Sequence, residues 1–162
     1  MSTVVLVFSS GMNIPLSESF EAEISKRDKA VKVINVENVN LPLFHSKNES
    51  ALPKDFDSVL HDLKSATSMV FVAPEYNGNV PPSFTNFLAF CSKSSKDWRE
   101  LFNTKKAVVA THSGGGGAHV LMHMRMQLSF IGMNVIGREI LTNYKKPVNP
   151  ESLTAVVDQL LG

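Results

Sequence analysis

The sequence has little of what several large classes of protein depend on. It contains one cysteine, Cys91, which excludes the disulfide framework of small secreted proteins. Its 16 basic and 15 acidic residues are interspersed and give a formal net charge of +1, so no nucleic acid partner is expected. No apolar run is long enough to cross a bilayer, and no signal-type segment is recognisable. We therefore expect a reduced, soluble, cytoplasmic protein without a membrane partner.

Boundaries between domains are also absent from the sequence. No internal repeat, low-complexity tract or linker interrupts the 162 residues, and a chain of this length can bury a sizeable core. The polar stretch 38–54 is interpreted as a long surface connection. We therefore expect a single domain that spans residues 1–162.

Apolar, strand-like runs alternate along the chain with segments of helical period. Strands are predicted at residues 3–8, 31–36, 69–73, 107–111 and 134–136. Helices are predicted at residues 16–26, 56–66, 82–92, 118–131 and 150–161. This alternation predicts an α/β fold, a flavodoxin-like three-layer sandwich with a five-stranded parallel sheet in the order 2-1-3-4-5. Such folds bind ligands where strands end, which here indicates the loops after Phe8, Ala73 and Thr111.

The loop after the third predicted strand reads Pro74-Glu75-Tyr76-Asn77-Gly78-Asn79-Val80-Pro81-Pro82. The strand before it is continuously apolar, as expected for a strand covered on both faces. The two prolines suit the entry of a helix, where a missing N–H costs little. The loop between this strand and this helix is composed to present backbone amides, and we take it as the main ligand loop.

The loop after the first strand is rich in side chains that can donate hydrogen bonds to an anion. They come shortly before or within the first turns of a helix, whose free N–H groups and dipole also favour a phosphate. The alternative is that a serine, Ser17 for example, simply caps the helix. The candidate phosphate ligands are Ser9, Ser10, Asn13, Ser17 and Ser19.

The loop after the fourth strand is Ser113 followed by the four glycines 114–117. Without side chains, this backbone can lie directly against a ring or a diphosphate. A flexible connector is the alternative, but glycine is costly to order and the loop leads straight into a helix. Its position at the end of a parallel strand favours a ligand.

These loops resemble those of the NADPH-dependent FMN reductase family, relatives of flavodoxin that include quinone, chromate and azo-dye reductases. Pro74 to Gly78, Pro81 and Asn86 match the family run P-E-Y-N-G-x-x-P-x-x-x-K-N, except that Thr85 replaces the lysine. The resemblance implies FMN at the edge of the sheet, with its phosphate at the first loop. It further implies that the ring lies between two sets of residues: Pro74, Glu75, Tyr76, Asn77 and Gly78 on one side, and Ser113, Gly114 and Gly115 on the other.

The first loop departs from the family pattern G-S-x-R-x-x-S-x-N. Met12 stands where the arginine would fall. A hydrogen bond from a charged donor contributes about 1.5–3 kcal/mol, so FMN binding is expected to be weaker by roughly tenfold to a hundredfold. If the helix starts near Ser17, Glu18 and Glu21 place further negative charge beside the phosphate.

The resemblance implies an FMN-dependent oxidoreductase. It would pass electrons from NADPH, or NADH, to a flavin, quinone or similar small-molecule acceptor by a ping-pong mechanism. Two alternatives stay open: an FMN-binding sensor or carrier, and a flavodoxin-like scaffold that has lost flavin binding, which Met12 favours.

Other candidate chemistry is weaker. His119 and His123 lie four residues apart on a predicted helix, but no cysteine or carboxylate completes a metal ligand set. Ser113 before the glycines resembles a nucleophile loop with His112 beside it, but adjacency in the sequence does not provide the hydrogen-bond geometry of a catalytic triad. Cys91 falls on the apolar stripe of its helix and is interpreted as a packing residue.

The helix after the glycines carries two apolar stripes. Leu121, Met124, Leu128 and Ile131 would face the sheet, and Met122, Met126 and Phe130 form a second stripe. A second stripe indicates a self-association surface, and the alternative is that long neighbouring loops cover it. The family resemblance also implies a homodimer or homotetramer.

Overall fold

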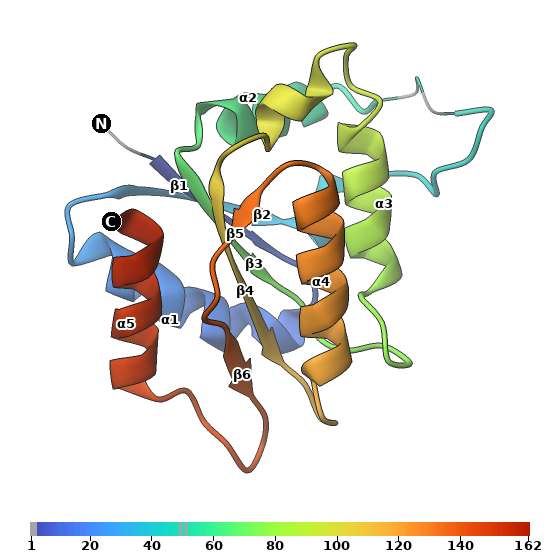
Figure 1. The fold of residues 1–162 in the computed structure, drawn as a ribbon. Coiled ribbons are helices and arrows are strands. Elements are labelled where there is room, and N and C mark those ends of the chain that lie inside the picture. The colour runs from blue at the N-terminus through green and yellow to red at the C-terminus, as the bar shows by residue number, and fades with distance from the viewer. Residues whose placement is uncertain (1–2, 49, 51) are drawn as a thin grey trace.

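A parallel β-sheet forms the centre of the structure, a computed structural model that describes residues 3–48, 50 and 52–162 (Figure 1). The strand order is β2-β1-β3-β4-β5, and β6 also pairs with β4. This confirms the order predicted from the alternation of strands and helices. Within the described ranges the strands are β1 (Thr3–Phe8), β2 (Ala30–Asn35), β3 (Ser68–Val72), β4 (Lys106–His112), β5 (Asn134–Val135) and β6 (Ile140–Thr142).

The outer edge of β4 is shared by two short strands. Ala107 at its start lies opposite Val135 of β5, whereas Thr111 near its end lies opposite Leu141 of β6. The strand predicted at 134–136 corresponds to β5, but β6 was not predicted. With three residues, β6 is too short to produce a recognisable pattern in the sequence.

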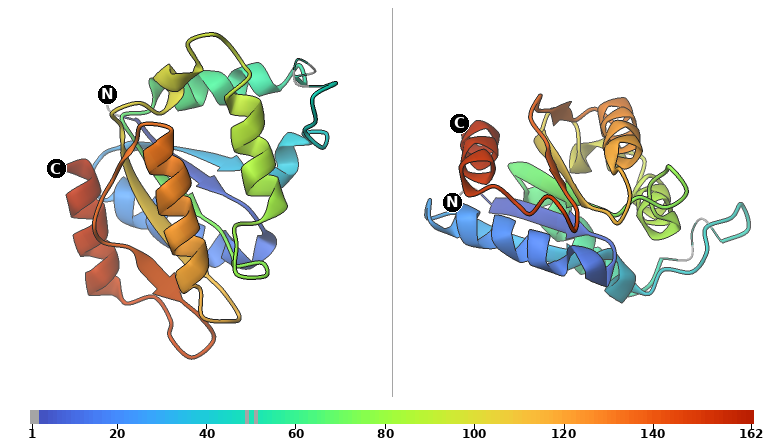
Figure 2. Two further views of the ribbon diagram at one scale, coloured as in Figure 1. Left: turned by 45° about the vertical axis from the view of Figure 1, so that its right-hand side comes forward. Right: turned by 90° about the horizontal axis from the view of Figure 1, so that it is seen from below.

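Helices cover both faces of the sheet. Because β1, β3 and β4 are buried on both sides, they read in the sequence as continuous apolar runs. The view from below in Figure 2 places α1 and α5 on one side of the sheet and α3 and α4 on the other. In the described part of the chain the helices are α1 (Ile14–Ser25), α2 (Phe56–Ser65), α3 (Pro82–Cys91), α4 (Ala118–Phe130) and α5 (Pro150–Leu161).

Two apolar layers result from this arrangement. Val4, Leu6 and Val70 face the layer of α1 and α5. The alternate strand residues, such as Val5 and Phe71, face the layer of α2, α3 and α4. The second layer is rich in phenylalanine, and Phe71 packs edge-on against Phe84 with ring centroids 6.0 Å apart.

Details of individual elements refine the sequence predictions. A short 3₁₀ turn at Gly11–Asn13 leads directly into α1, which begins at Ile14, two residues earlier than predicted. Leu121, Met124 and Leu128 of α4 are buried, as expected for the stripe that faces the sheet. Cys91 is buried as well, and desolvation raises the pKa of its thiol, which suits a packing residue. None of the helices in the described ranges has both the length and the apolar character needed to span a membrane.

Candidate cofactor site

The loop after β1 begins with two buried serines. The Ser9 N–H donates to the Val72 carbonyl at 3.1 Å, but its hydroxyl has no hydrogen-bond partner among the described residues. Ser10 has a φ of 95°, which a residue with a side chain rarely adopts and which costs on the order of 1–3 kcal/mol. Its Oγ accepts the Met12 N–H at 3.3 Å. The loop is thus strained at Ser10 and offers a free hydroxyl at Ser9, two properties typical of ligand-binding loops.

The other three predicted phosphate ligands make contacts within the protein. The Asn13 side chain is buried and bonds to the backbone of His112 at the end of β4. The hydroxyls of Ser17 and Ser19 donate to the carbonyls of Asn13 and Pro15, at 2.9 and 2.8 Å. Ser9, Ser10 and Asn13 therefore come together in the loop, whereas the hydroxyls of Ser17 and Ser19 are engaged within the first turns of α1.

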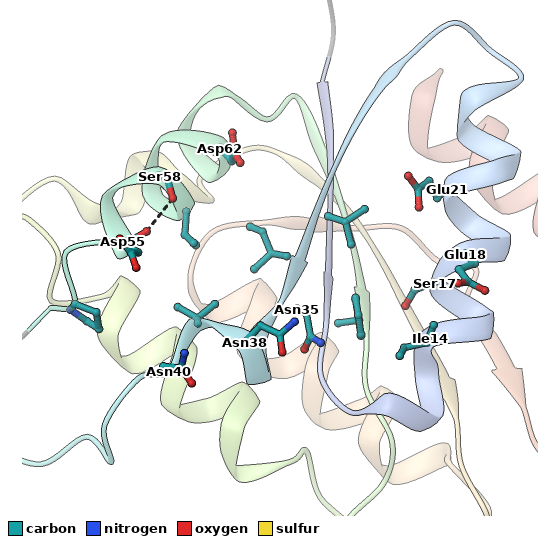
Figure 3. Close-up of a pocket in the computed structure, with 16 residues that line it drawn as sticks. Ile14, Ser17, Glu18, Glu21, Asn35, Asn38, Asn40, Asp55, Ser58 and Asp62 are labelled. Atoms are coloured by element: carbon teal, nitrogen blue, oxygen red, sulfur yellow. Dashed lines mark hydrogen bonds between the residues drawn. The ribbon is translucent and has the colours of Figure 1, made fainter.

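Glu18 and Glu21 of α1 face a different part of the molecule. Because α1 begins at Ile14, its first turn contains no acidic residue. Glu18 and Glu21 instead line a cleft of about 770 Å³ at the edge of β2. Figure 3 shows them on one side of this cleft, with Asp55 and Asp62 on the other. Of the predicted site residues, only Ser17 lines this cleft.

A tight turn forms the loop between β3 and α3. Tyr76 and Asn79 exchange two backbone hydrogen bonds of 2.9 Å. The two residues between them, Asn77 and Gly78, have φ values of 50° and 70°. Asparagine and glycine are the residues that best tolerate this left-handed conformation, which explains why both occur here. The turn leaves Tyr76 exposed, while Pro74 at its base is buried.

Glu75 connects this turn to the start of α4. Its Oε2 accepts the N–H groups of His119 and Val120 at 3.1 and 3.3 Å. The same oxygen lies 3.6 Å from Nδ1 of His119. The residue at the N-cap position of α4 is Gly117, which makes no side-chain capping bond. Glu75 therefore caps α4 from another loop.

The glycines at 114–117 have two different roles. Gly117 has a φ of 75°, and a Cβ added to it would lie 3.0 Å from Cγ2 of Thr111, so the fold itself requires glycine there. A Cβ on Gly115 or Gly116 would meet nothing within 4 Å. These two glycines are exposed and are not required by packing within the chain. Their bare backbone suits the close approach of a flat ligand.

A cluster next to the glycine loop was missed by the sequence analysis. The Thr142 hydroxyl donates to the Thr111 carbonyl at 3.0 Å and lies 3.0 Å from Nδ1 of His112. Since the hydroxyl proton is used by Thr111, the His112 nitrogen acts as the donor. The Tyr144 ring packs edge-on against His112, with centroids 5.5 Å apart. No signal in the sequence linked these residues, because β6 was not predicted.

The residues at this edge fit a phosphorylated flavin better than a metal ion. Ser9 and Thr111, at the ends of β1 and β4, have buried hydroxyls to which no described residue is hydrogen-bonded. The backbone of the glycine loop is open, as a planar ring would need. In contrast, the described residues contain no group of three or more His, Cys, Asp or Glu side chains that could hold a metal.

Known proteins share both the sequence features and the fold. The family model described as NADPH-dependent FMN reductase matches residues 4–146. An FMN-dependent NADH:quinone oxidoreductase of Shewanella loihica is 23% identical over 146 residues, which cover 79% of this chain and 72% of that protein.

Two solved structures show the likeness of the fold. The flavoenzyme NAD(P)H:(acceptor) oxidoreductase FerB from Paracoccus denitrificans has a TM-score of 0.80 at 16% identity, over 99% of this chain and 96% of that one. A flavodoxin from the domain Archaea has a TM-score of 0.68 at 13% identity, over 100% of both chains. Because the family model covers most of its length, this flavodoxin-like chain belongs to the NADPH-dependent FMN reductase family, whose members are oxidoreductases.

Proposed function

We propose that this protein binds FMN where β1, β3 and β4 end and passes electrons from NAD(P)H to a quinone, a flavin or a similar small acceptor. The observation that carries this proposal is the Glu75 contact with α4, which brings the P-E-Y-N-G loop and the glycine loop together. Both loops carry the residues on which the family resemblance rests. Their placement at one edge of a parallel sheet is the arrangement expected for a ligand site.

The phosphate end of the site lies at the loop after β1. Ser9 offers a buried hydroxyl with no partner in the ranges that the structure describes, and Ser10 holds the loop in its strained conformation. Asn13 fixes the loop to the backbone of His112, and the hydroxyls of Ser17 and Ser19 are engaged within the adjoining helix. Position 12 holds a half-exposed methionine and therefore offers no guanidinium to the phosphate. We therefore propose weak, exchangeable FMN binding.

The ring end of the site lies between two loops. On one side it is formed by Pro74, Glu75, Tyr76, Asn77 and Gly78, and on the other by Ser113, Gly114 and Gly115. Bound FMN would supply the hydride chemistry itself. The protein contributes preorganised backbone N–H groups that favour negative charge on a ligand, and this role needs no titrating base. No catalytic side chain is proposed.

The kinetic mechanism we propose is ping-pong. The nicotinamide donor and the acceptor would use the same open face beside Gly115 and Gly116 in turn, so the oxidised donor must leave before the acceptor enters. The family description supports NADPH, and the name of the Shewanella relative supports NADH with a quinone. Initial rates, measured against nicotinamide concentration at several fixed quinone concentrations, test this mechanism. Parallel double-reciprocal lines are expected, whereas lines that intersect would contradict it.

We also propose that the single domain of residues 1–162 acts in the cytoplasm as a homodimer. The second stripe of α4 is exposed, with Met122 and Met126 both 64% and Phe130 77% accessible. Beside it, an apolar groove of about 530 Å³ runs between α3 and α4. Exposed methionine and aromatic side chains next to a groove are typical of interfaces between proteins.

The alternative is a protein that holds FMN without turnover or has lost FMN, and Met12 is the observation that favours it. Equilibrium titration with FMN, monitored by flavin fluorescence, first distinguishes a protein that binds FMN from one that has lost it. Saturable binding supports the reductase and the carrier. Absence of binding up to millimolar FMN would leave only the scaffold.

A further inference from the structure

The Glu75 carboxylate joins two segments that are far apart in the chain. It receives two backbone N–H groups from α4, which begins more than 40 residues later, and it lies within reach of the His119 ring. Its side chain is only 14% exposed, whereas the His119 side chain is 68% exposed. The principal contacts of this carboxylate are therefore the α4 amides.

The start of α4 depends on a group from outside the helix. The first N–H groups of any helix lack partners within it and are normally satisfied by a side chain at the N-cap. Helix α5 follows this rule, because Oδ1 of Asn149 accepts the Ser152 N–H at 2.8 Å. Gly117 has no side chain with which to do the same. A carboxylate at this position also interacts favourably with the positive end of the helix dipole.

The glycine loop has few other anchors. Its first residue, Ser113, is held by a bond of 3.2 Å from its N–H to the Thr142 carbonyl. Gly114, Gly115 and Gly116 are exposed, and for two of them a Cβ would meet nothing. Ordering consecutive glycines is entropically costly. The Glu75 contact with α4 fixes the far end of this loop.

We propose that Glu75 is a positioning residue, which sets the separation between the P-E-Y-N-G loop and the glycine loop before the cofactor arrives. This inference rests on the proposed function for its consequence in FMN binding. It also explains at which end of the site the phosphate of the cofactor would bind. Because a protein carboxylate occupies the α4 N-terminus, an anionic phosphate is left with the loop at the start of α1.

The test compares Glu75→Ala with Glu75→Gln. Alanine removes the acceptor oxygen, while glutamine keeps an oxygen that can accept the same N–H groups. Glu139→Gln is the matched control, because Glu139 also bonds to α4, through Nε of Arg125 at 2.8 Å, but away from both loops. Amide hydrogen exchange of all variants is measured first without FMN, so this readout does not depend on the proposed function.

In the FMN-free protein, Glu75→Ala is expected to accelerate exchange locally in residues 113–120. Glu75→Gln should restore most of the protection, and Glu139→Gln should leave the segment unchanged. Unchanged exchange in 113–120 for Glu75→Ala, or acceleration spread equally over the whole chain, would overturn the proposal.

The second readout is the dissociation constant of FMN, with the visible circular dichroism of the saturated complex. Glu75→Ala is expected to weaken FMN binding by about tenfold and to alter the dichroism, with Glu75→Gln within about threefold of wild type. Faster loop exchange with unchanged FMN affinity and dichroism would also overturn the positioning role. If the wild-type protein binds no FMN, the proposed function fails, and the exchange experiment alone decides whether Glu75 orders the loop.

Discussion

The side-chain amide of Asn13 pairs with the backbone of His112, 99 positions further along the chain. Oδ1 of Asn13 accepts the His112 N–H at 2.8 Å, and Nδ2 donates to the His112 carbonyl at 3.3 Å. Asn13 is fully buried. The pair fixes the loop after β1 to the end of β4, so the proposed phosphate loop has a defined position relative to the glycine loop.

Replacing Asn13 with alanine is therefore expected to lower the free energy of unfolding. The substitution leaves two backbone groups of His112 without their partner, at a cost of about 1–3 kcal/mol. Urea denaturation measures this cost. Ser19→Ala serves as the control, because its partly exposed hydroxyl bonds only within α1 and its removal should change stability by about 0.5 kcal/mol or less. Equal effects of the two substitutions would contradict the role given to Asn13.

Met12→Arg should strengthen FMN binding. The new guanidinium restores the charged donor that the family pattern places here, so the dissociation constant is expected to fall by roughly tenfold or more and to become more sensitive to salt. The measurement is a fluorescence titration with FMN at two salt concentrations. Leu43→Arg, at a side chain that is 78% exposed in another loop, adds the same charge and should have little effect. If both variants gain equally, net charge rather than position 12 explains the result.

The fold was accessible from the sequence because the central strands β1, β3 and β4 are buried on both faces. Continuous apolar runs such as that of β3 mark these strands clearly, and Pro82 marks the start of α3. The three ligand loops followed from the order of the elements. The short strand β6 and the His112–Thr142 contact were not accessible, because a strand of three residues is too short to show a recognisable pattern of apolar residues.

Side-chain direction was the other limit of the sequence analysis. Ser9, Ser10, Ser17 and Ser19 are the same residue type, yet of these four only Ser9 has a hydroxyl that finds no partner in the described part of the chain. Which serine faces the loop depends on where the helix starts, and this was predicted two residues too late. Similarly, the contact of Glu75 with α4 joins positions 44 and 45 residues apart, and no local pattern indicates it.

Stability should depend on pH through Glu23, which joins α1 to α5. Hydrogen bonds from Lys26, Arg27 and Thr154 lower its pKa from 4.5 to about 2. A carboxylate with a lowered pKa contributes stability that is complete above its unfolded-state pKa and is lost as pH falls toward the folded-state value. Glu23→Gln should therefore be less stable than wild type at pH 7, and the difference should shrink between pH 4.5 and pH 2.

Urea unfolding at pH 7, 4 and 2.5 measures this difference. Glu21→Gln, at an exposed position of the same helix, is the control and should follow wild type at each pH. A difference between Glu23→Gln and wild type that stays constant over this pH range would show that ionisation of Glu23 does not contribute.

The exposed stripe of α4 should govern self-association. Introducing charge with Met126→Glu and Phe130→Glu together is expected to convert the proposed dimer to a monomer, because a desolvated charge in an apolar interface is strongly unfavourable. Sedimentation velocity measures the assembly state. Leu43→Glu adds a charge at another exposed apolar residue and should stay dimeric. A double variant that remains dimeric would place the interface elsewhere. A monomeric wild-type protein would contradict the proposed dimer itself.

The most direct test of the proposed reductase is the visible absorbance of the protein saturated with FMN, recorded anaerobically before and after addition of NADPH, NADH and then a quinone. A protein that binds FMN and is a reductase should lose the absorbance of oxidised flavin with at least one nicotinamide and regain it with the quinone, far faster than free FMN under the same conditions. Bound flavin that stays oxidised with both nicotinamides, or that reacts no faster than free FMN, would contradict the proposed electron transfer.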